Sequence, residues 1–356
     1  MNISDQNIKK PLIIAGPCSA ESQHQLLETA HQLTNYISIF RAGIWKPRTR
    51  PNSFEGVGEK ALPWLIEVKK QTGLKVATEV ANTKHVEACL KANVDVLWIG
   101  ARTTVNPFYV QEIASALKGV NITVMVKNPL HPELSLWMGA LERLNKVGVT
   151  QLYAIHRGFF TLEKSAFRNE PKWEIPIKLK RLAPNLPLLC DPSHISGNTN
   201  MIGEVSQTAM DLNMDGLMVE VHHQPHQALS DAQQQITPKQ LNKILNKLIL
   251  RTSTTPNVAF ISLLNKLRSQ IDTIDKQLVN VVSQRTELVK EIAKYKKENG
   301  VTILQIERWF EILKTRKQWG ELTNLDPQMI ADLFELIHKH SVLTQTHILN
   351  DNDTLG

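Results

Sequence analysis

The feature that most constrains the fold is a repeated alternation of short apolar runs with amphipathic helical stretches over the first two thirds of the chain. Each run is rich in β-forming residues and continuously apolar, which is typical of strands covered on both faces. Eight such units in roughly 240 residues match the size of a closed (β/α)8 barrel. An open dinucleotide-binding sheet is the alternative, but no GxGxxG motif follows the first run. The runs cover residues 11–18, 40–45, 75–80, 96–100, 123–128, 152–157, 188–193 and 216–222.

Polar and ionisable residues recur where these runs end. The carboxyl ends of parallel barrel strands meet at one rim, where barrel enzymes carry out their chemistry. Charged groups at nearly all eight ends therefore indicate an active site. The predicted rim residues are Cys18, Lys46, Glu79, Arg102, Lys127, Arg157, Asp191, His194 and Glu220.

Composition excludes several classes of protein. The net charge of +7 is not gathered into basic runs, which favours small phosphorylated substrates over nucleic acid. No apolar run approaches the roughly 20 residues of a membrane span, and the N-terminus has no secretory-signal pattern. Three cysteines in 356 residues form no disulfide framework, so we expect a reduced, cytoplasmic compartment.

Two sets of rim residues suggest a chemistry. One set mixes sulfur, nitrogen and oxygen donors, which suits a divalent transition metal such as Mn²⁺, Fe²⁺, Co²⁺ or Zn²⁺. It comprises Cys18, His194, Glu220 and Asp231, with His222 and His223 as competing ligands. The other set is cationic and suits two phosphorylated anions held together. It comprises Arg41, Lys46, Arg48, Arg102, Lys127 and Arg157.

The pattern changes after a polar linker at residues 251–257, which separates a predicted barrel domain (1–250) from a predicted helical domain (258–356). Apolar residues alternate at spacings of three and four from Leu264 to Tyr295, which predicts one helix of about 40 residues. Further helices are expected over about 303–318 and from Asp326-Pro327 to about Leu349. A three-helix monomer cannot cover so long a seam, so we expect a homodimer.

Arg285 occupies a seam position otherwise filled by Leu, Ile and Val, and a buried arginine requires an anion. Lys296 lies about 20° away around the helix at 100° per residue, so the two cations share a face. Arg268 lies too far along the helix to serve the same pocket in one chain. Ser341 and Gln345 share a face of the last helix. The alternative interpretation is an oligomerising coiled coil with a polar residue that sets its register.

The motifs AGPCSAES, FRAGIWKPRTRP, IGAR, VKNP, HRG, DPSH and VEVHHQPHQALSDAQQ resemble those of DAHP synthases, in the branch related to octulosonate-phosphate synthases. The resemblance implies condensation of phosphoenolpyruvate with erythrose 4-phosphate, because KPRT stands where an octulosonate-phosphate synthase would carry a KANRSS-like segment. It places the metal ligands on Cys18, His194, Glu220 and Asp231, the phosphoenolpyruvate contacts on Arg41, Lys46, Ala101, Arg102, Lys127 and Arg157, and the aldose-phosphate contacts on Arg48 and Thr49. Lys46, Glu79 and Asp191 are the expected catalytic groups, with Asp191 near the aldehyde and Glu79 orienting water.

The segments LRSQIDTIDKQLVNVVSQRTELVKEIAKYK, ERW and HSVLTQ resemble the all-helical chorismate mutases. This resemblance implies an intertwined dimer in which Arg268 of one chain completes a chorismate site of the other. The remaining site residues are Arg285, Lys296, Arg308, Ser341 and Gln345, with Lys296 and Gln345 polarising the ether oxygen. This chain departs from the family pattern at two positions. Gln305 stands where relatives often have Asp, and Trp309 stands where they have the Glu that binds the substrate hydroxyl.

The expectation is therefore a bifunctional enzyme in which prephenate feeds back on the synthase. One alternative keeps the barrel catalytic and makes the helical domain a dimerising sensor without turnover. Another is an octulosonate-phosphate or sialate-type synthase barrel. Neither a nucleic acid nor a membrane is an expected partner.

Overall fold

The computed structural model describes residues 1, 3, 11–46, 54–162, 165–252 and 254–350. The chain divides into two compact units, residues 1–253 and 254–356, which are described separately. No helix in the described part of the chain has the length and apolarity that crossing a membrane would require.

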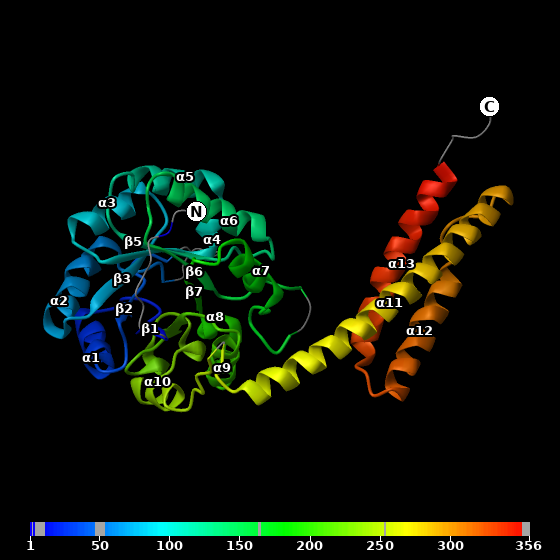
Figure 1. Cartoon of the computed structure of the whole chain (residues 1–356). Helices are drawn as coiled ribbons and strands as arrows, with labels where there is room; N and C mark the ends of the chain where they lie inside the picture. The colour runs from blue at the N-terminus through cyan, green and yellow to red at the C-terminus, as the bar shows by residue number, and fades with distance from the viewer. Residues whose placement is uncertain (2, 4–10, 47–53, 163–164, 253, 351–356) are drawn as a thin grey trace. The chain divides into compact units, whose positions relative to one another are not determined.

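The first unit is a closed parallel barrel ringed by helices (Figure 1). Each strand pairs with the next, and β8 pairs with β1. All eight expected strands are present, and the barrel prediction is confirmed. Leu12, Ile14, Trp98, Met125 and Met218 belong to the apolar cluster that fills its interior. The strands are β1 Leu12–Gly16, β2 Ile39–Arg41, β3 Lys75–Val80, β4 Val96–Ile99, β5 Thr123–Lys127, β6 Leu152–His156, β7 Leu188–Cys190 and β8 Gly216–Glu220.

Helices surround the barrel and bury the outward-facing side chains of the strands (Figure 1). The α-helices are α1 Gln23–Leu33, α2 Leu62–Thr72, α3 Thr83–Lys91, α4 Ala101–Thr104, α5 Pro107–Ala116, α6 Leu134–Lys146, α7 Glu174–Leu182, α8 Pro192–Ser196, α9 Ile202–Asp211 and α10 Pro238–Leu245. Short 3₁₀ turns are η1 Gly58–Ala61, η2 Pro225–Gln227 and η3 Ala232–Gln234. Two short α-helices, α4 and α8, begin just after the ends of strands β4 and β7 and therefore lie at the rim.

Strand β2 is shorter than the apolar run predicts, because the chain leaves the sheet after Arg41. At Gly43 the backbone passes so close to its neighbours that an added Cβ would lie 2.9 Å from Lys46 Nζ and 3.0 Å from the Cys18 carbonyl oxygen. The early exit from the strand is what brings Lys46 over the end of β1.

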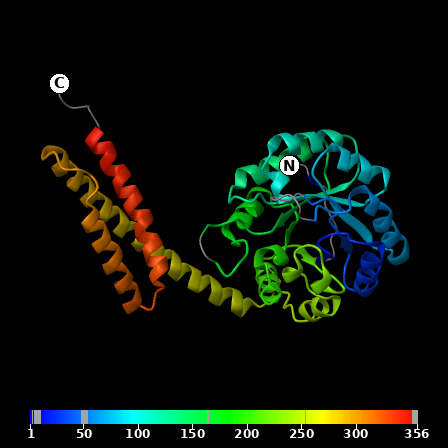
Figure 2. The same ribbon diagram turned by 180° about the vertical axis from the view of Figure 1, so that it is seen from behind.

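The described residues of the second unit form the helices α11 Val258–Glu298, α12 Ile306–Leu322 and α13 Pro327–Asn350 (Figure 2). α13 packs against both α11 and α12. The predicted 40-residue helix is present, whereas α12 begins three residues later than predicted. The Ile303 carbonyl, which precedes α12, accepts a 2.6 Å hydrogen bond from Lys296 Nζ.

Much of α11 is left uncovered by α12 and α13, the other described helices of its unit. Its first half extends beyond α12 and α13 in both views (Figures 1 and 2). The seam residues Leu267, Ile271, Ile274 and Leu278 are all exposed. Farther along, α11 packs on α13, and there Val289 and Ala293 are buried.

Candidate active sites

Three side chains that could together hold a metal ion converge at the carboxyl ends of the barrel strands. Cys18 follows β1, Glu220 ends β8, and Asp231 lies in the loop after β8. One ligand atom of each lies within 4.8 Å of the others. Cys18 Sγ is 3.3 Å from Asp231 Oδ2. The sequence places these residues more than 200 positions apart, and closure of the barrel between β1 and β8 unites them.

His194 lies beside this trio, in the helix α8 that starts after β7. Its Nδ1 is 2.8 Å from Asp191 Oδ2 and its Nε2 is 3.9 Å from Glu220 Oε1. Asp191 also caps α8 by accepting a 3.0 Å bond from the His194 amide. The ring is thus oriented by a carboxylate on one side and faces the trio with its other nitrogen, as is usual for a metal-binding histidine.

The electrostatics of the trio suit a cation. Burial, with Glu220 adding to it, raises the pKa of the Cys18 thiol to about 12. Burial alone would raise the pKa of Glu220, but His194, Arg41 and Lys46 outweigh it and hold that carboxylate ionised. Deep burial beside two carboxylates favours a divalent ion that displaces the thiol proton. The mixed donor set fits a transition metal.

Two buried cations, Arg41 and Lys127, and the half-buried Lys46 lie around the trio. Arg41 Nη1 is 2.7 Å from Glu220 Oε1, and Lys127 Nζ is 2.7 Å from Asp191 Oδ2. Lys46 Nζ donates to the Cys18 carbonyl and lies 3.1 Å from Cys18 Sγ. The barrel brings these three cations together from separate places in the chain. Arg41 ends β2, Lys127 ends β5, and Lys46 lies in the loop after β2.

Arg157 follows β6 and is also buried. Its Nη1 donates to Asn169 Oδ1 at 2.7 Å, and its amide donates to Asn128 Oδ1 at 2.7 Å. Burial lowers its pKa to about 10; Asp191 opposes this shift, while Arg168 and Arg102 add to it. Even so, the guanidinium stays charged at neutral pH and can bind an anion.

Glu79, on β3, is held at the edge of this site. Its Oε2 accepts a 3.1 Å bond from the Trp98 indole, and an added Cβ on Gly100 would lie 2.1 Å from Oε1. Gly100 is therefore required for Glu79 to occupy this position. Ala101 is buried and Arg102 exposed at the start of α4.

The two histidines expected as competing metal ligands, His222 and His223, contact groups outside the trio. His222 Nδ1 accepts from the Gln224 amide at 2.9 Å and its Nε2 lies 3.9 Å from Glu21. His223 Nδ1 lies 3.3 Å from Thr29 Oγ1. Arg48 and Thr49, the expected aldose-phosphate contacts, lie outside the described residues.

Sequence reasoning missed four residues that support the site. Arg168 pairs with Asp231, Gln234 Nε2 donates to Glu220 Oε2 at 2.6 Å, and Gln235 accepts from the Cys18 amide at 2.9 Å. Asn169 binds Arg157. The two glutamines belong to the DAQQQ segment, which offered a signal, whereas Arg168 and Asn169 lie in a loop with no periodicity.

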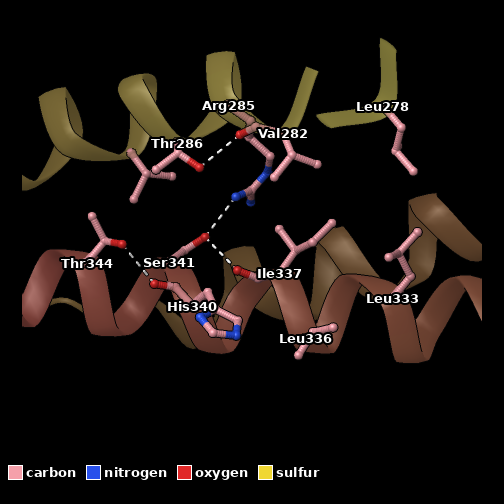
Figure 3. A pocket seen from close by; sticks show the side chains of 11 residues that line it. Leu278, Val282, Arg285, Thr286, Leu333, Leu336, Ile337, His340, Ser341 and Thr344 are labelled. Atoms are coloured by element: carbon pink, nitrogen blue, oxygen red, sulfur yellow. Dashed lines mark hydrogen bonds between the residues drawn. The ribbon is translucent and has the colours of Figure 1, made fainter. Parts of the chain in front are cut away.

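In the second unit, Arg285 and Ser341 join α11 to α13 (Figure 3). Arg285 Nη1 donates to Ser341 Oγ at 2.7 Å, and Ser341 donates to the Ile337 carbonyl at 2.8 Å. They lie in a pocket of about 470 Å³ whose other lining is mostly apolar, including Leu278, Val282 and Leu336. Gln345 is buried nearby on α13, and within the described chain its Oε1 has no hydrogen-bond partner.

The other predicted residues of this unit are less tightly grouped. Arg308 is exposed and lies 2.6 Å from Glu311. Arg268 is exposed on the uncovered half of α11. His338 stacks on Trp309 at 3.9 Å between ring centroids, a pair that the sequence did not predict. Burial, with Arg285 and Lys296 adding to it, lowers the pKa of His338, so both cations act on one neutral ring.

A closed barrel whose rim gathers buried cations and side chains of types that can ligate a metal defines the first unit as a (β/α)8-barrel enzyme domain. The chain belongs to the DAHP synthetase I family, whose family model matches residues 3–255. A phospho-2-dehydro-3-deoxyheptonate aldolase of Thermotoga maritima is 34% identical over 225 residues, covering 63% of this chain and 64% of the relative. The chain thus spans less than two thirds of that relative's length.

Further comparisons agree with this assignment. A crystal structure of the Thermotoga maritima DAHP synthase superposes with a TM-score of 0.61 at 31% identity, covering 69% of this chain and 71% of that one. A 2-dehydro-3-deoxyphosphooctonate aldolase of Wolinella succinogenes is 26% identical over 259 residues, covering 67% of this chain and 98% of the relative.

Residues 267–346 match the chorismate mutase type II family model. A bifunctional chorismate mutase/prephenate dehydratase of Buchnera aphidicola is 41% identical over 83 residues, covering 23% of this chain and 22% of that protein. The chain therefore joins a DAHP synthase domain to a chorismate mutase domain, as predicted.

Proposed function

We propose that the barrel unit condenses phosphoenolpyruvate with erythrose 4-phosphate to 3-deoxy-D-arabino-heptulosonate 7-phosphate, and that the helical unit rearranges chorismate to prephenate. The observation that carries the synthase proposal is the convergence of Cys18, Glu220 and Asp231 within 4.8 Å, with His194 beside them. Family membership supports the same reaction.

These four residues would hold a divalent metal such as Mn²⁺, which supplies Lewis-acid activation of the aldehyde carbonyl when bound. Arg41, Lys127 and Arg157 would bind the carboxylate and phosphate of phosphoenolpyruvate, with Ala101 and Arg102 completing that subsite. Arg48 and Thr49 would hold the phosphate of the aldose.

The carbon–carbon bond forms when the enol carbon of phosphoenolpyruvate attacks the aldehyde carbon, whose oxygen takes up a proton. Lys46, which lies beside Cys18, would donate that proton. Water then adds to the adjacent carbon of phosphoenolpyruvate, and inorganic phosphate leaves. Glu79 would orient this water, and Asp191 would hold the aldehyde in place by its position between Lys127 and His194.

For the mutase, Arg285 would bind a substrate carboxylate, and Lys296 with Gln345 would stabilise the breaking ether bond. Arg308 and Ser341 would complete the pocket. Trp309, at the position of the usual hydroxyl-binding Glu, is the observation that favours the alternative of a sensor without turnover.

A homodimer would complete the helical unit. The uncovered seam of α11 is apolar and too exposed for a protomer to remain alone. Arg268 lies on this uncovered half, where it would complete the pocket of a partner chain. A ligand in that pocket, prephenate in particular, would feed back on the synthase.

Two assays on the full chain test this proposal. Cys18→Ala should lose the synthase reaction alone, and Arg285→Ala the mutase reaction alone. Erythrose 4-phosphate should be used far better than arabinose 5-phosphate; the reverse preference would assign the barrel to the octulosonate-phosphate class. A wild-type chain that binds chorismate without converting it would establish the sensor alternative.

A further inference from the structure

The residue pair Arg168–Asn169 touches both halves of the proposed synthase site. It lies in the loop between β6 and α7, outside every motif recognised in the sequence. Four side-chain hydrogen bonds run from this pair to residues proposed to bind the metal or the phosphoenolpyruvate, or to their supports.

Arg168 acts on the metal ligands. Its Nη1 lies 3.0 Å from Asp231 Oδ1 and 2.5 Å from Gln234 Oε1. Gln234 in turn donates to Glu220 Oε2 at 2.6 Å. Since Arg168 holds Oδ1 of Asp231, the other oxygen stays turned toward Cys18, at 3.3 Å from its sulfur.

Asn169 links the proposed metal ligand His194 to Arg157, the proposed phosphoenolpyruvate contact. Its Oδ1 accepts from Arg157 Nη1 at 2.7 Å, and its Nδ2 donates to the His194 carbonyl at 2.6 Å. The side chain is buried, so both bonds are shielded from competing water. A single amide therefore fixes the guanidinium of Arg157 relative to the backbone of His194.

The backbone around the pair is built for close approach. The amides of Asn169 and Arg168 donate to the carbonyls of Ile195 at 3.1 Å and Ser196 at 3.4 Å. Gly158 and Gly197 both have positive φ; an added Cβ would lie 2.5 Å from the Asn169 carbonyl oxygen and 2.3 Å from Arg168 Cβ. The loop is thus packed along α8 at the site of His194.

We infer that Arg168 and Asn169 are positioning residues that couple metal binding to phosphoenolpyruvate binding, so that each ligand strengthens the other. The inference rests on the proposed function, because it takes the metal at Cys18, His194, Glu220 and Asp231 and the anion at Arg157. Coupling of this kind must be reciprocal in the two affinities.

Binding measurements on the full chain test the inference without turnover. The chain is freed of metal with a chelator, and Co²⁺ is titrated while the thiolate-to-cobalt absorption band is followed. Phosphoenolpyruvate affinity is measured by calorimetry with and without Co²⁺. The ratio of the two dissociation constants is the coupling factor.

Wild type should show a coupling factor within the usual range of about 5–150. Arg168→Ala should weaken Co²⁺ about 10–100-fold, as expected for loss of a residue that orients a metal ligand, and Arg168→Lys should recover part of it. Arg181→Ala, an exposed arginine on α7, is the matched control and should change neither affinity.

Variants of Asn169 distinguish its hydrogen bond with Arg157 from its hydrogen bond with the His194 carbonyl. Asn169→Ala should bring the coupling factor close to one. Asn169→Asp keeps the acceptor for Arg157 but loses the donor to His194, so metal-free binding of phosphoenolpyruvate should persist while coupling is lost. Thermal unfolding midpoints near that of wild type show that these variants are folded.

Three outcomes separate the possibilities. No coupling in wild type, or equal coupling in wild type and Asn169→Ala, overturns the inference and leaves the proposed function intact. Unchanged Co²⁺ affinity in Arg168→Ala overturns the part assigned to Arg168. A wild-type chain without a thiolate-to-cobalt band contradicts the proposed metal site itself.

Discussion

Arg41 and Glu220 form a buried ion pair, with Nη1 2.7 Å from Oε1 and each side chain about 1% exposed. The pair spans the end of β1, because β2 and β8 both flank that strand. Together with His194, Arg41 therefore keeps Glu220 ionised.

We expect Arg41→Met to be strongly destabilising. Removing one partner of a buried pair costs about 3–5 kcal/mol, because an uncompensated charge is left. A bound divalent ion replaces part of the lost positive charge, so the loss should be smaller with metal than with chelator. Denaturant unfolding under both conditions measures this; equal losses would show that Glu220 does not face the metal.

Removal of the metal or of its ligands should stop the synthase. Cys18→Ala and His194→Ala should abolish turnover without unfolding the barrel, since the Lewis acid is lost. Chelation should have the same effect on wild type and be reversed by added Mn²⁺. Undiminished activity after exhaustive chelation would contradict a metal-dependent reaction.

His156 should make the barrel less stable in acid. Burial among Trp137, Phe159 and Trp173, with Arg157 adding to it, lowers its pKa to about 3. An unfolded histidine has a pKa of about 6.5, so between these values the unfolded state binds a proton that the native state excludes. Stability should fall by about 1.4 kcal/mol for each pH unit below 6.5 from this group.

The control for this prediction is His156→Gln, which keeps a polar side chain but cannot titrate. Unfolding free energies from pH 7 to pH 4.5 should decline less steeply for the variant than for wild type. Parallel profiles would mean that His156 is already protonated in the folded barrel or is not buried.

Prephenate should inhibit the synthase through the mutase pocket. We expect at least roughly fivefold inhibition at saturation, the lower range of typical coupling between sites. Arg285→Ala should remove the effect, because the anion loses the cation that binds it. Lys290→Ala, an exposed lysine on the same helix, is the control. Equal inhibition of the Arg285 variant would place the effector elsewhere.

The sequence predicted most of the barrel because the relevant signals are local. Continuous apolar runs define strands, and parallel strands bring their ends to one rim, so the approach of Cys18 to Glu220 followed without knowing any loop. Asp231 lies in the loop after β8, and its place beside them was expected from the LSDAQQQ segment and the family resemblance. The 41 residues of α11 followed from a spacing that only a helix satisfies. Conversely, β2 ended early because of a close approach at Gly43, which depends on where Cys18 lies in space.

The supporting residues could not be predicted for the same reason. Asn169 matters because it meets Arg157 and the His194 carbonyl, and neither contact leaves a pattern in the loop that contains it. Trp309 and His338 lie on different helices, so their stacking depends on how α12 and α13 pack. Arg308 was assigned to the pocket, yet in the protomer it pairs with Glu311.

The uncovered half of α11 has a consequence for mass action. In the proposed homodimer a second chain buries this apolar face, which would tie the stability of the helical unit to protomer concentration. We expect its unfolding temperature to rise with concentration while that of the barrel does not. On dilution the mutase should therefore lose activity before the synthase, so the abundance of the chain would set the ratio of its two activities.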